Sequence, residues 1–427
     1  MKRCLIALAL LGLLIGSKPV RADNELHRYV FNGAAIWEKQ GEKQVDGVTV
    51  TDLHLISQTW QGMIWEHRLM LFRPPNSTFP NFCTLLNTGG RGGDDDMKMG
   101  AMIAKSSGMP FAILFGIPKQ PLYGGKTEDE LVVYTWQKYL ETGDSTWPLH
   151  FPMAKAVVKA MDALQEYSLY AKIPEIKEFL ITGASKRGWT TWLVGATKDK
   201  RVKGIAPMVI DTLNVGVQIP HQIESYGKAS EEIADYSKSG MLDALNTEKG
   251  RKLLALEDPY SYRDILTLPK LIINGTNDQY WAQDALNFYW DGLKGKKWIA
   301  YIPNSGHGLE DRVRTFNSLT AFGQMLARRT KWPEMKWQYT ESDSGVELLL
   351  NSDIKPKAAR LFRVYSSTKD FRNSKWTYEP MTTTSQGIIG QLKHPSKGYA
   401  AMYGEAVYEI GGKTFTLTTQ IRIVSYK

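Results

Sequence analysis

Short, unbroken apolar runs alternate with helix-type patterns over residues 80–330, and this rhythm constrains the fold more than any other feature of the chain. The apolar runs occupy residues 82–87, 110–116, 178–182, 202–210, 270–274 and 298–302, with helix-type apolar spacing over residues 97–105 and 148–170. Strands that are apolar on both faces are typical of a parallel sheet covered by crossover helices. The sequence therefore predicts an α/β fold with a doubly wound, mostly parallel sheet.

Three other segments depart from this rhythm. Residues 25–75 alternate apolar and polar positions between turn signals, which predicts an N-terminal β-rich segment with hairpins. Residues 212–266 are helix-like and long for a connection, so we expect a helical cap insertion, although a surface bulge without function explains the same length. Residues 334–427 contain about seven strand patterns, which predicts a C-terminal immunoglobulin- or fibronectin-like β-sandwich. The α/β domain is expected to span residues 23–330.

Residues 1–22 have the three parts of a cleaved signal peptide: Lys2 and Arg3, an apolar run ending near Gly16, and the small residue Ala22. An uncleaved N-terminal anchor is the alternative. Cleavage would lower the formal charge from +9 to +5 and leave Cys83 as the only cysteine, which excludes an internal disulfide. We therefore expect an exported protein, periplasmic or secreted, with no integral membrane segment after cleavage. So mild a charge gives no reason to expect a nucleic-acid partner.

The sequence ITGASKRGW places Ser185 between a predicted strand and a predicted helix. A nucleophile elbow needs this context, because its tight turn projects the serine hydroxyl above the sheet and tolerates only small neighbours. Gly183 lies two residues before the serine. The usual G-x-S-x-G pattern has its second glycine two residues after the serine, whereas this chain has Arg187 there and Gly188 one position later. A serine that caps an ordinary helix is the alternative.

An acid and a histidine follow Ser185 in the order of an α/β-hydrolase, each just after a predicted strand. Asp278 follows the strand KLIIN, and His307 follows the strand WIAYI in a glycine-flanked loop. The sequence therefore predicts a catalytic triad in which Ser185 attacks a carbonyl carbon, His307 relays the proton and Asp278 orients the imidazole. Asp211, which also ends a strand, is the reserve acid.

Groups that stabilise an oxyanion and bind substrate are predicted around this triad. The expected oxyanion donors are the backbone of Lys186, the loop at Gly89 and Gly90, and the side chain of Arg187, for which an exposed or ion-paired arginine is the alternative. Candidate substrate-binding side chains are Trp147, Trp189, His221, Tyr280 and Trp281, although tryptophans more often belong to the core. The acidic run at residues 94–96 has no histidine or cysteine nearby, so we expect neither a metal nor another cofactor.

The runs GASKRGWTTW, RVKGIAPMVID, LIINGTNDQYW and PNSGHGL resemble the PhoPQ-activated pathogenicity-related protein family over most of the chain. This resemblance implies an α/β-hydrolase fold and export in bacteria, and the family's name reflects regulation rather than a defined reaction. The elbow is also similar to the G-C-S-R-x-G motif of glucuronoyl esterases, with Ala184 in place of the cysteine and Lys186 in place of the arginine.

The leading hypothesis is an exported, esterase-like serine hydrolase that cleaves an ester or amide through an acyl-enzyme. Its partner would be a small-molecule, peptide or glycan-ester substrate. A peptidase of the prolyl-oligopeptidase kind is the enzymatic alternative. The other class is a non-catalytic, hydrolase-fold binding protein of the bacterial envelope that acts in virulence or envelope stress.

Overall fold

The computed structural model describes residues 22–410 and 412–426. Apart from Ala22, the predicted signal peptide lies outside these residues. The described chain begins with the helix α1 (Ala22–Phe31), which the sequence patterns did not predict. This helix packs against α4 (His150–Tyr170), where Leu26 and Val30 are fully buried.

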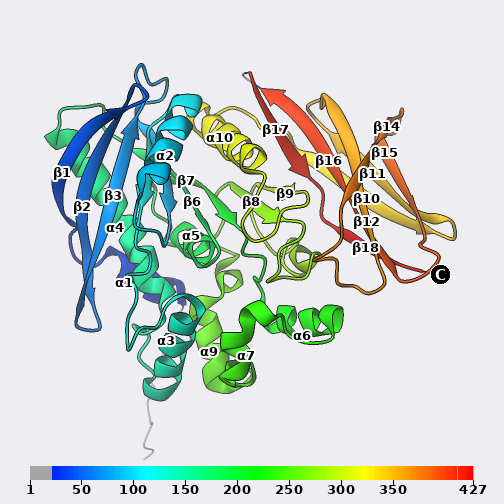
Figure 1. Cartoon of the computed structure of the whole chain (residues 1–427), viewed down its shortest axis with the longest axis horizontal. Helices are drawn as coiled ribbons and strands as arrows, with labels where there is room; N and C mark the ends of the chain where they lie inside the picture. Colours follow the sequence, from blue (N-terminus) through cyan, green and yellow to red (C-terminus); the bar gives the residue numbers. More distant parts are fainter. Residues whose placement is uncertain (1–21, 411, 427) are drawn as a thin grey trace, which may run out of the picture.

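A nine-stranded mixed sheet forms the centre of the molecule (Figure 1). Its strands are β1 (Ile36–Val45), β2 (Val48–Trp60), β3 (Met63–Arg73), β4 (Phe82–Asn87), β5 (Phe111–Leu114), β6 (Glu178–Ala184), β7 (Val202–Met208), β8 (Lys270–Gly275) and β9 (Lys297–Ile302). Their spatial order is β1-β2-β3-β5-β4-β6-β7-β8-β9. Neighbouring strands in the part β5-β4-β6-β7-β8-β9 run parallel to one another. The pairs β1-β2, β2-β3 and β3-β5 are antiparallel. The predicted α/β class and the β-rich N-terminal segment are both confirmed.

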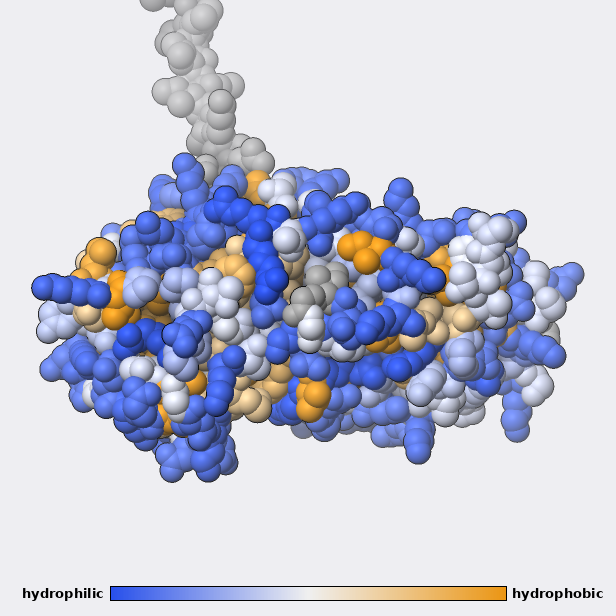
Figure 2. Space-filling view, turned by 90° about the horizontal axis from the view of Figure 1, so that it is seen from above, coloured by the Kyte–Doolittle hydropathy of each residue, from blue (hydrophilic) through white to orange (hydrophobic). Residues whose placement is uncertain are grey.

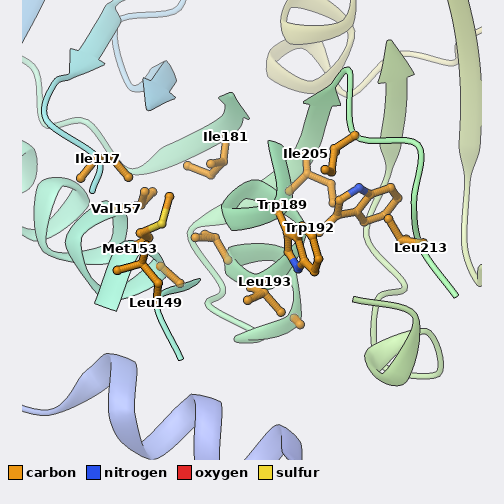
Figure 3. Packing of buried hydrophobic residues seen from close by; sticks show 14 of the residues in the cluster. Ile117, Leu149, Met153, Val157, Ile181, Trp189, Trp192, Leu193, Ile205 and Leu213 are labelled. Carbon is orange, nitrogen blue, oxygen red and sulfur yellow. The ribbon is translucent and has the colours of Figure 1, made fainter. Parts of the chain in front are cut away.

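Helices cover both faces of this sheet (Figure 1). One face carries α4 and α5 (Lys186–Ala196), whose buried residues belong to the largest hydrophobic cluster; Figure 3 shows Met153, Val157, Trp192 and Leu193 packed there. The other face carries α2 (Asp94–Ser107) and α10 (Arg312–Arg328), which contact one another. The acidic run at residues 94–96 is the first turn of α2, where negative charge complements the helix dipole.

Residues 212–266 are mostly helical. They contain α6 (Val215–Tyr226), α7 (Ala234–Lys238), α8 (Met241–Ala244) and α9 (Glu248–Glu257), with short 3₁₀ turns at η1 (Glu231–Ile233) and η2 (Pro259–Tyr262). A further 3₁₀ turn, η3 (Ala285–Phe288), follows β8, and α3 (Glu128–Thr142) packs against α7 and α9. This helical layer lies at the end of the sheet where the parallel strands finish (Figure 1).

The C-terminal β region (residues 335–425) consists of two antiparallel sheets. The first has the order β10-β11-β15-β14, the second has the order β13-β12-β16-β17, and β18 pairs with β16. The bounds are β10 (Met335–Ser342), β11 (Gly345–Ser352), β12 (Ala358–Ser366), β13 (Thr377–Pro380), β14 (Thr382–Thr383), β15 (Ile388–Lys393), β16 (Tyr399–Ile410), β17 (Lys413–Thr418) and β18 (Arg422–Ser425). Apolar residues of both sheets share one buried cluster that includes Leu348 and Met402.

The C-terminal β region packs directly against the α/β part of the chain (Figure 1). Trp332 stacks on Phe415 at 4.9 Å between ring centres, and Tyr301 of β9 lies 5.7 Å from Tyr403. The face of the molecule in Figure 2 is mostly hydrophilic, with small, scattered hydrophobic areas. Among the described residues, no helix is both long enough and apolar enough to cross a membrane.

Candidate active site

Ser185 occupies a strained turn between β6 and α5. Its φ of 58° and ψ of −128° are unusual for a residue with a side chain and cost on the order of 1–3 kcal/mol. A Cβ at Gly183 would lie 2.6 Å from the Arg187 carbonyl oxygen, and a Cβ at Gly188 would lie 2.7 Å from the carbonyl oxygen of Met208. The displaced Gly188 therefore allows α5 to approach the sheet closely, despite the departure from the usual motif.

His307 and Asp278 form a hydrogen-bonded pair after two adjacent strands. His307 Nδ1 lies 2.9 and 3.0 Å from the two carboxylate oxygens of Asp278. The backbone N–H of Tyr280 also donates to Asp278, at 2.9 Å. A carboxylate only accepts hydrogen bonds, so Nδ1 carries a proton, and in the neutral imidazole Nε2 then has a free lone pair. This is the tautomer that a general base needs.

Tyr280 connects this pair to the serine. Its ring centre lies 4.1 Å from that of His307, and it lines the same cavity as Ser185. Within residues 22–410 and 412–426, His307 Nε2 is buried without a hydrogen-bond partner, and no hydrogen bond joins Ser185 to His307. Such contacts are often long in free enzymes and tighten when substrate binds.

A mostly apolar cavity adjoins Ser185. Its walls are the side chains or backbone of Asp129, Trp136, Ser185, Lys186, Trp189, Ile210, Thr212, Val215, Ile219, Ile233, Tyr236, Leu242, Leu245, Tyr280 and Trp281. The helical segment at residues 212–266 contributes about half of these walls. The space able to hold water-sized groups is about 40 Å³, which admits a small group only.

One ion pair interrupts the apolar wall beside the serine. Lys186 Nζ donates to Asp129 at 2.8 Å, and the Tyr236 hydroxyl donates to the other carboxylate oxygen at 3.0 Å. The lysine also lies 5.9 Å from the centre of the Tyr280 ring. The side chains of Lys186 and Asp129 are 8% and 13% exposed, so the pair is largely shielded from water.

The predicted oxyanion residues Gly89 and Arg187 lie together, next to Glu128. The Arg187 guanidinium donates to the two Glu128 oxygens at 2.6 and 2.7 Å, and its Nε donates to the Ile117 carbonyl. A Cβ at Gly89 would lie 2.0 Å from this guanidinium, so a larger residue there would displace the Arg187 side chain. Burial raises the pKa of Glu128, but hydrogen bonds and the charge of Arg187 outweigh it and lower that pKa to about 2. This ion pair is the alternative that the sequence left open for Arg187. Oxyanion roles for Lys186, Gly89, Gly90 and Arg187 stay predictions.

The reserve acid has a different partner. Asp211 is buried and accepts a 2.6 Å hydrogen bond from the Tyr289 hydroxyl, while the imidazole of His307 contacts Asp278. Burial raises the pKa of Asp211 to about 8. The two neighbouring carboxyl groups therefore have different environments and partners, and of the two only that of Asp278 contacts His307.

Three of the five candidate substrate-binding residues line the cavity and two do not. Trp189, Tyr280 and Trp281 are in its walls. Trp147 instead packs in an aromatic cluster 5.9 Å from Trp60, and His221 pairs with Asp284 at 2.6 Å. Substrate binding by any of the five stays a prediction.

The aromatic wall is fixed from behind by a buried carboxylate. Glu257 accepts a hydrogen bond from Trp136 at 2.8 Å and contacts His150 Nδ1 at 2.6 Å. The Trp189 indole donates to the Glu257 backbone at 2.5 Å and stacks on His150. These contacts leave the two tryptophans little freedom to rotate.

The sequence patterns missed several residues at this site. Asp129 sits in the acidic first turn of α3, which looks like an ordinary helix N-terminus. Trp136 and Tyr236 carry no motif that separates them from core residues. Among the described residues, no cluster of three or more histidine, cysteine or acidic side chains could hold a metal ion.

Comparisons with known proteins match most of the chain. A family model described as PhoPQ-activated pathogenicity-related protein matches residues 26–372. Autocrine proliferation repressor protein A of Dictyostelium discoideum is 31% identical over 451 residues, covering 95% of this chain and 89% of that protein.

Solved structures give more distant matches. Acetyl xylan esterase 1 from Thermoanaerobacterium sp. JW/SL YS485 is 14% identical with a TM-score of 0.49, covering 71% of this chain and 92% of that one. An S-formylglutathione hydrolase from Agrobacterium tumefaciens is 15% identical with a TM-score of 0.46, covering 69% of this chain and all of that one.

Proposed function

Because the chain belongs to the PhoPQ-activated pathogenicity-related protein family, whose name describes no reaction, we propose its function from the site itself: an esterase-like serine hydrolase that acts through Ser185, His307 and Asp278. The observation that carries this proposal is the conjunction of a strained serine at the β6–α5 turn with a histidine whose Nδ1 is held by an aspartate. A serine that only capped a helix would need neither feature.

The reaction follows from these three groups. Ser185 Oγ attacks the carbonyl carbon of the substrate while His307 Nε2 accepts the hydroxyl proton. The tetrahedral intermediate collapses to an acyl-enzyme, and His307 returns the proton to the departing alcohol or amine. Water then attacks the acyl-enzyme, giving up a proton to His307, and the acid product leaves as the proton returns to Ser185. Asp278 stabilises the imidazolium in both halves.

Backbone donors would stabilise the oxyanion. The N–H of Lys186 is the first of α5, where helix N–H groups have no partner within the helix. The glycine-containing loop at Gly89 and Gly90 supplies the second donor in this proposal. Arg187, being paired with Glu128, would hold this loop against the elbow rather than contact the substrate.

The cavity favours a short acyl group. A space of about 40 Å³ corresponds to only a few water-sized groups, and its walls are chiefly apolar. An acetyl-sized group would fit beside Ser185, with the alcohol or amine portion directed towards solvent. Substrates would accordingly be small esters, acylated glycans or acylated peptides.

We assign the finer fold as an α/β-hydrolase domain with a doubly wound sheet, a helical cap at residues 212–266 and a C-terminal sandwich of immunoglobulin or fibronectin type. Strand-end placement of the three catalytic side chains and the two facing antiparallel sheets support this assignment. Export to the periplasm or the medium is part of the proposal and depends on residues 1–22.

A panel of p-nitrophenyl esters and aminoacyl-nitroanilides tests this function. We expect wild-type protein to release nitrophenol from the acetate, and Ser185→Ala to lose this activity while unfolding at the same temperature. Cleavage of the anilides instead would favour the peptidase. Equal, background rates for both proteins on both series would contradict the proposal.

A non-catalytic binding protein is the second candidate, favoured by the missing hydrogen bond between Ser185 and His307. On that account a ligand would bind wild type and Ser185→Ala equally, with no turnover by either protein.

A further inference from the structure

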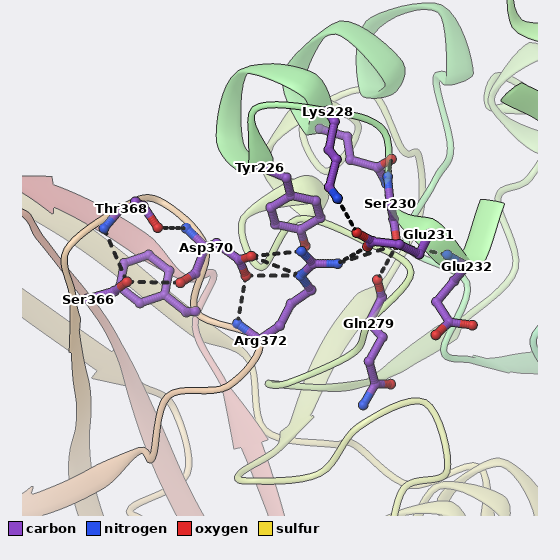
Figure 4. A network of polar contacts seen from close by, with 12 residues as sticks. Tyr226, Lys228, Ser230, Glu231, Glu232, Gln279, Ser366, Thr368, Asp370 and Arg372 are labelled. Atoms are coloured by element: carbon purple, nitrogen blue, oxygen red, sulfur yellow. Dashed lines mark hydrogen bonds and ion pairs between the residues drawn. The ribbon is translucent and has the colours of Figure 1, made fainter. Parts of the chain in front are cut away.

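One loop of the C-terminal β region reaches across to the loops that carry Asp278 and His307. This β12–β13 loop (residues 367–376) follows β12 and lies against the segment after α6 (Figure 4). Figure 4 shows Arg372 directed towards Tyr226, Asp370 and Glu231. The loop therefore joins two parts of the chain at the place where the acid–base pair is built.

Asn277, the residue before the triad acid, is bound to this loop. Its Nδ2 contacts three backbone carbonyl oxygens of the loop, those of Phe371, Arg372 and Ser374, at 3.4, 3.1 and 2.7 Å. Its own backbone N–H donates to Ser305 at 2.9 Å, in the segment that leads to His307. One side chain thus fixes the acid loop to the C-terminal β region, and its backbone fixes the same loop to the histidine loop.

Asn304, three residues before His307, makes a matching contact. Its Nδ2 donates to the Trp376 carbonyl at 3.1 Å, and its Oδ1 accepts from the Trp376 N–H at 2.8 Å. The Asn304 backbone N–H donates to Thr276 Oγ1 at 2.8 Å. The histidine loop is therefore fixed to the same β12–β13 loop and to the acid loop.

Arg372 completes the connection on the other side of the acid. Its guanidinium lies 3.9 Å from the centre of the Tyr226 ring, and the Tyr226 hydroxyl donates to the backbone of Trp281 at 2.5 Å. The Arg372 guanidinium also contacts Ser230 Oγ at 3.5 Å, and Ser230 donates to the backbone of Gln279 at 2.7 Å. Asn277 thus holds the chain before Asp278, and Arg372 holds the chain after it through two intermediate side chains.

We propose that the C-terminal β region is a positioning element of the catalytic site, and that Asn277 and Asn304 set the alignment of Asp278 with His307 from its β12–β13 loop. This inference rests on the proposed function. A displacement of about 1 Å in a catalytic group can cost roughly 100-fold in rate, so short side chains that fix two loops to one another can control turnover without touching the substrate. They are positioning residues and contact no reacting atom.

Asn277→Ala and Asn304→Ala test the proposal against Asn287→Ala as the matched control. Asn287 lies in η3, nine residues after Asp278, and also binds the C-terminal β region. Its contacts are to the Ile421 carbonyl at 3.0 Å and to Gln420 at 2.7 Å, in the segment between β17 and β18 rather than in the β12–β13 loop. All three variants lose contacts between the same two parts of the chain. We expect kcat for p-nitrophenyl acetate to fall by roughly 10–100-fold in the first two, with KM little changed, and to stay within about twofold of wild type in Asn287→Ala.

A spectroscopic readout separates this proposal from the hydrolase proposal. The chain has seven histidines, so the ring ¹³Cε1–¹H resonance of His307 can be assigned by its loss in His307→Gln. We expect this resonance to move in Asn277→Ala and Asn304→Ala and to stay in place in Asn287→Ala, whether or not the wild type hydrolyses any ester. If Asn277→Ala does not fold, Asn304→Ala alone decides. An unmoved resonance with wild-type kcat, or equal losses in all three variants, would overturn the positioning role.

Discussion

The close contact between α5 and the sheet at Gly188 makes a sharp prediction for Gly188→Ala. An added Cβ would lie 2.7 Å from the Met208 carbonyl oxygen, 2.9 Å from Ile210 Cγ2 and 3.0 Å from the Gly183 carbonyl oxygen. Real Cβ atoms essentially never approach within 3.0 Å of a heavy atom. Two of the three neighbours are backbone atoms of β6 and β7, which cannot rotate away, so α5 itself must move.

The size of the effect follows from these distances. Relaxing the contacts towards the roughly 3.5 Å of an ordinary nonbonded approach moves the start of α5 by about 0.5–1 Å. Overpacking of this kind costs about 1–3 kcal/mol, and the better helix propensity of alanine returns up to ~1 kcal/mol. We expect a net loss of about 1–2 kcal/mol in the free energy of unfolding. Because Ser185 and the Lys186 N–H move with the helix, esterase activity should fall at least about tenfold.

Urea unfolding and hydrolysis of p-nitrophenyl acetate measure the two effects separately. Gly216→Ala is the control, because a Cβ at this helical position of α6 meets no atom within 4 Å. That variant should be as stable as wild type or more so, with unchanged turnover. If Gly188→Ala matched wild type in both stability and turnover, our explanation of the displaced glycine would be wrong.

Three further predictions concern the charges and the size of the site. Asp278→Asn should lower kcat by about 10⁴-fold with little change in KM for p-nitrophenyl acetate, because the amide favours the wrong imidazole tautomer; turnover within tenfold of wild type would refute the assigned acid. The pKa of Asp211 is raised by burial to about 8, so the folded chain keeps a proton that the unfolded chain releases near pH 4. The free energy of unfolding should therefore fall, by up to several kcal/mol, as pH rises from about 4 to about 8. Asp211→Asn keeps an acceptor for Tyr289 and should reduce the difference in the free energy of unfolding between pH 5 and pH 8, measured by urea unfolding. If that difference were the same as in wild type, the raised pKa of Asp211 would be refuted. The small cavity should make p-nitrophenyl acetate a better substrate than the octanoate by at least about tenfold. Leu242→Ala, which removes part of the cavity wall, should reduce the ratio of acetate to octanoate turnover. A preference of the wild-type protein for the octanoate would contradict the short-acyl proposal.

The α/β part of the fold was predictable because burial on both faces leaves a strong signal. The run at residues 82–87 is β4 with the same bounds, and the run at residues 270–274 differs from β8 by one residue. The helix α1 was missed because its region was assigned from the alternating pattern of the hairpins that follow it. The sequence patterns indicated about seven strands over residues 334–427, whereas the described residues there form nine, partly because the chain leaves the sheet after Thr418 and pairs again from Arg422.

The triad candidates were predictable because strand ends are local features, and the pairing of Asp278 with His307 follows their strands being neighbours. The sequence could not choose the partner of Arg187. That choice depends on Glu128, whose place beside the elbow is set by packing between segments nearly 60 residues apart. Asn277 and Asn304 carried no signal for the same reason, since their partners lie more than 70 residues further on.

Covalent labelling of Ser185 tests the central claim most directly. A fluorophosphonate forms a bond to an activated serine Oγ and releases fluoride, so it reports the nucleophile without knowledge of the substrate. We expect stoichiometric labelling of wild type, with the adduct mapped to Ser185 by peptide mass spectrometry, and a large loss of rate in His307→Gln. No adduct at Ser185, under conditions that label a known serine hydrolase completely, would contradict the account.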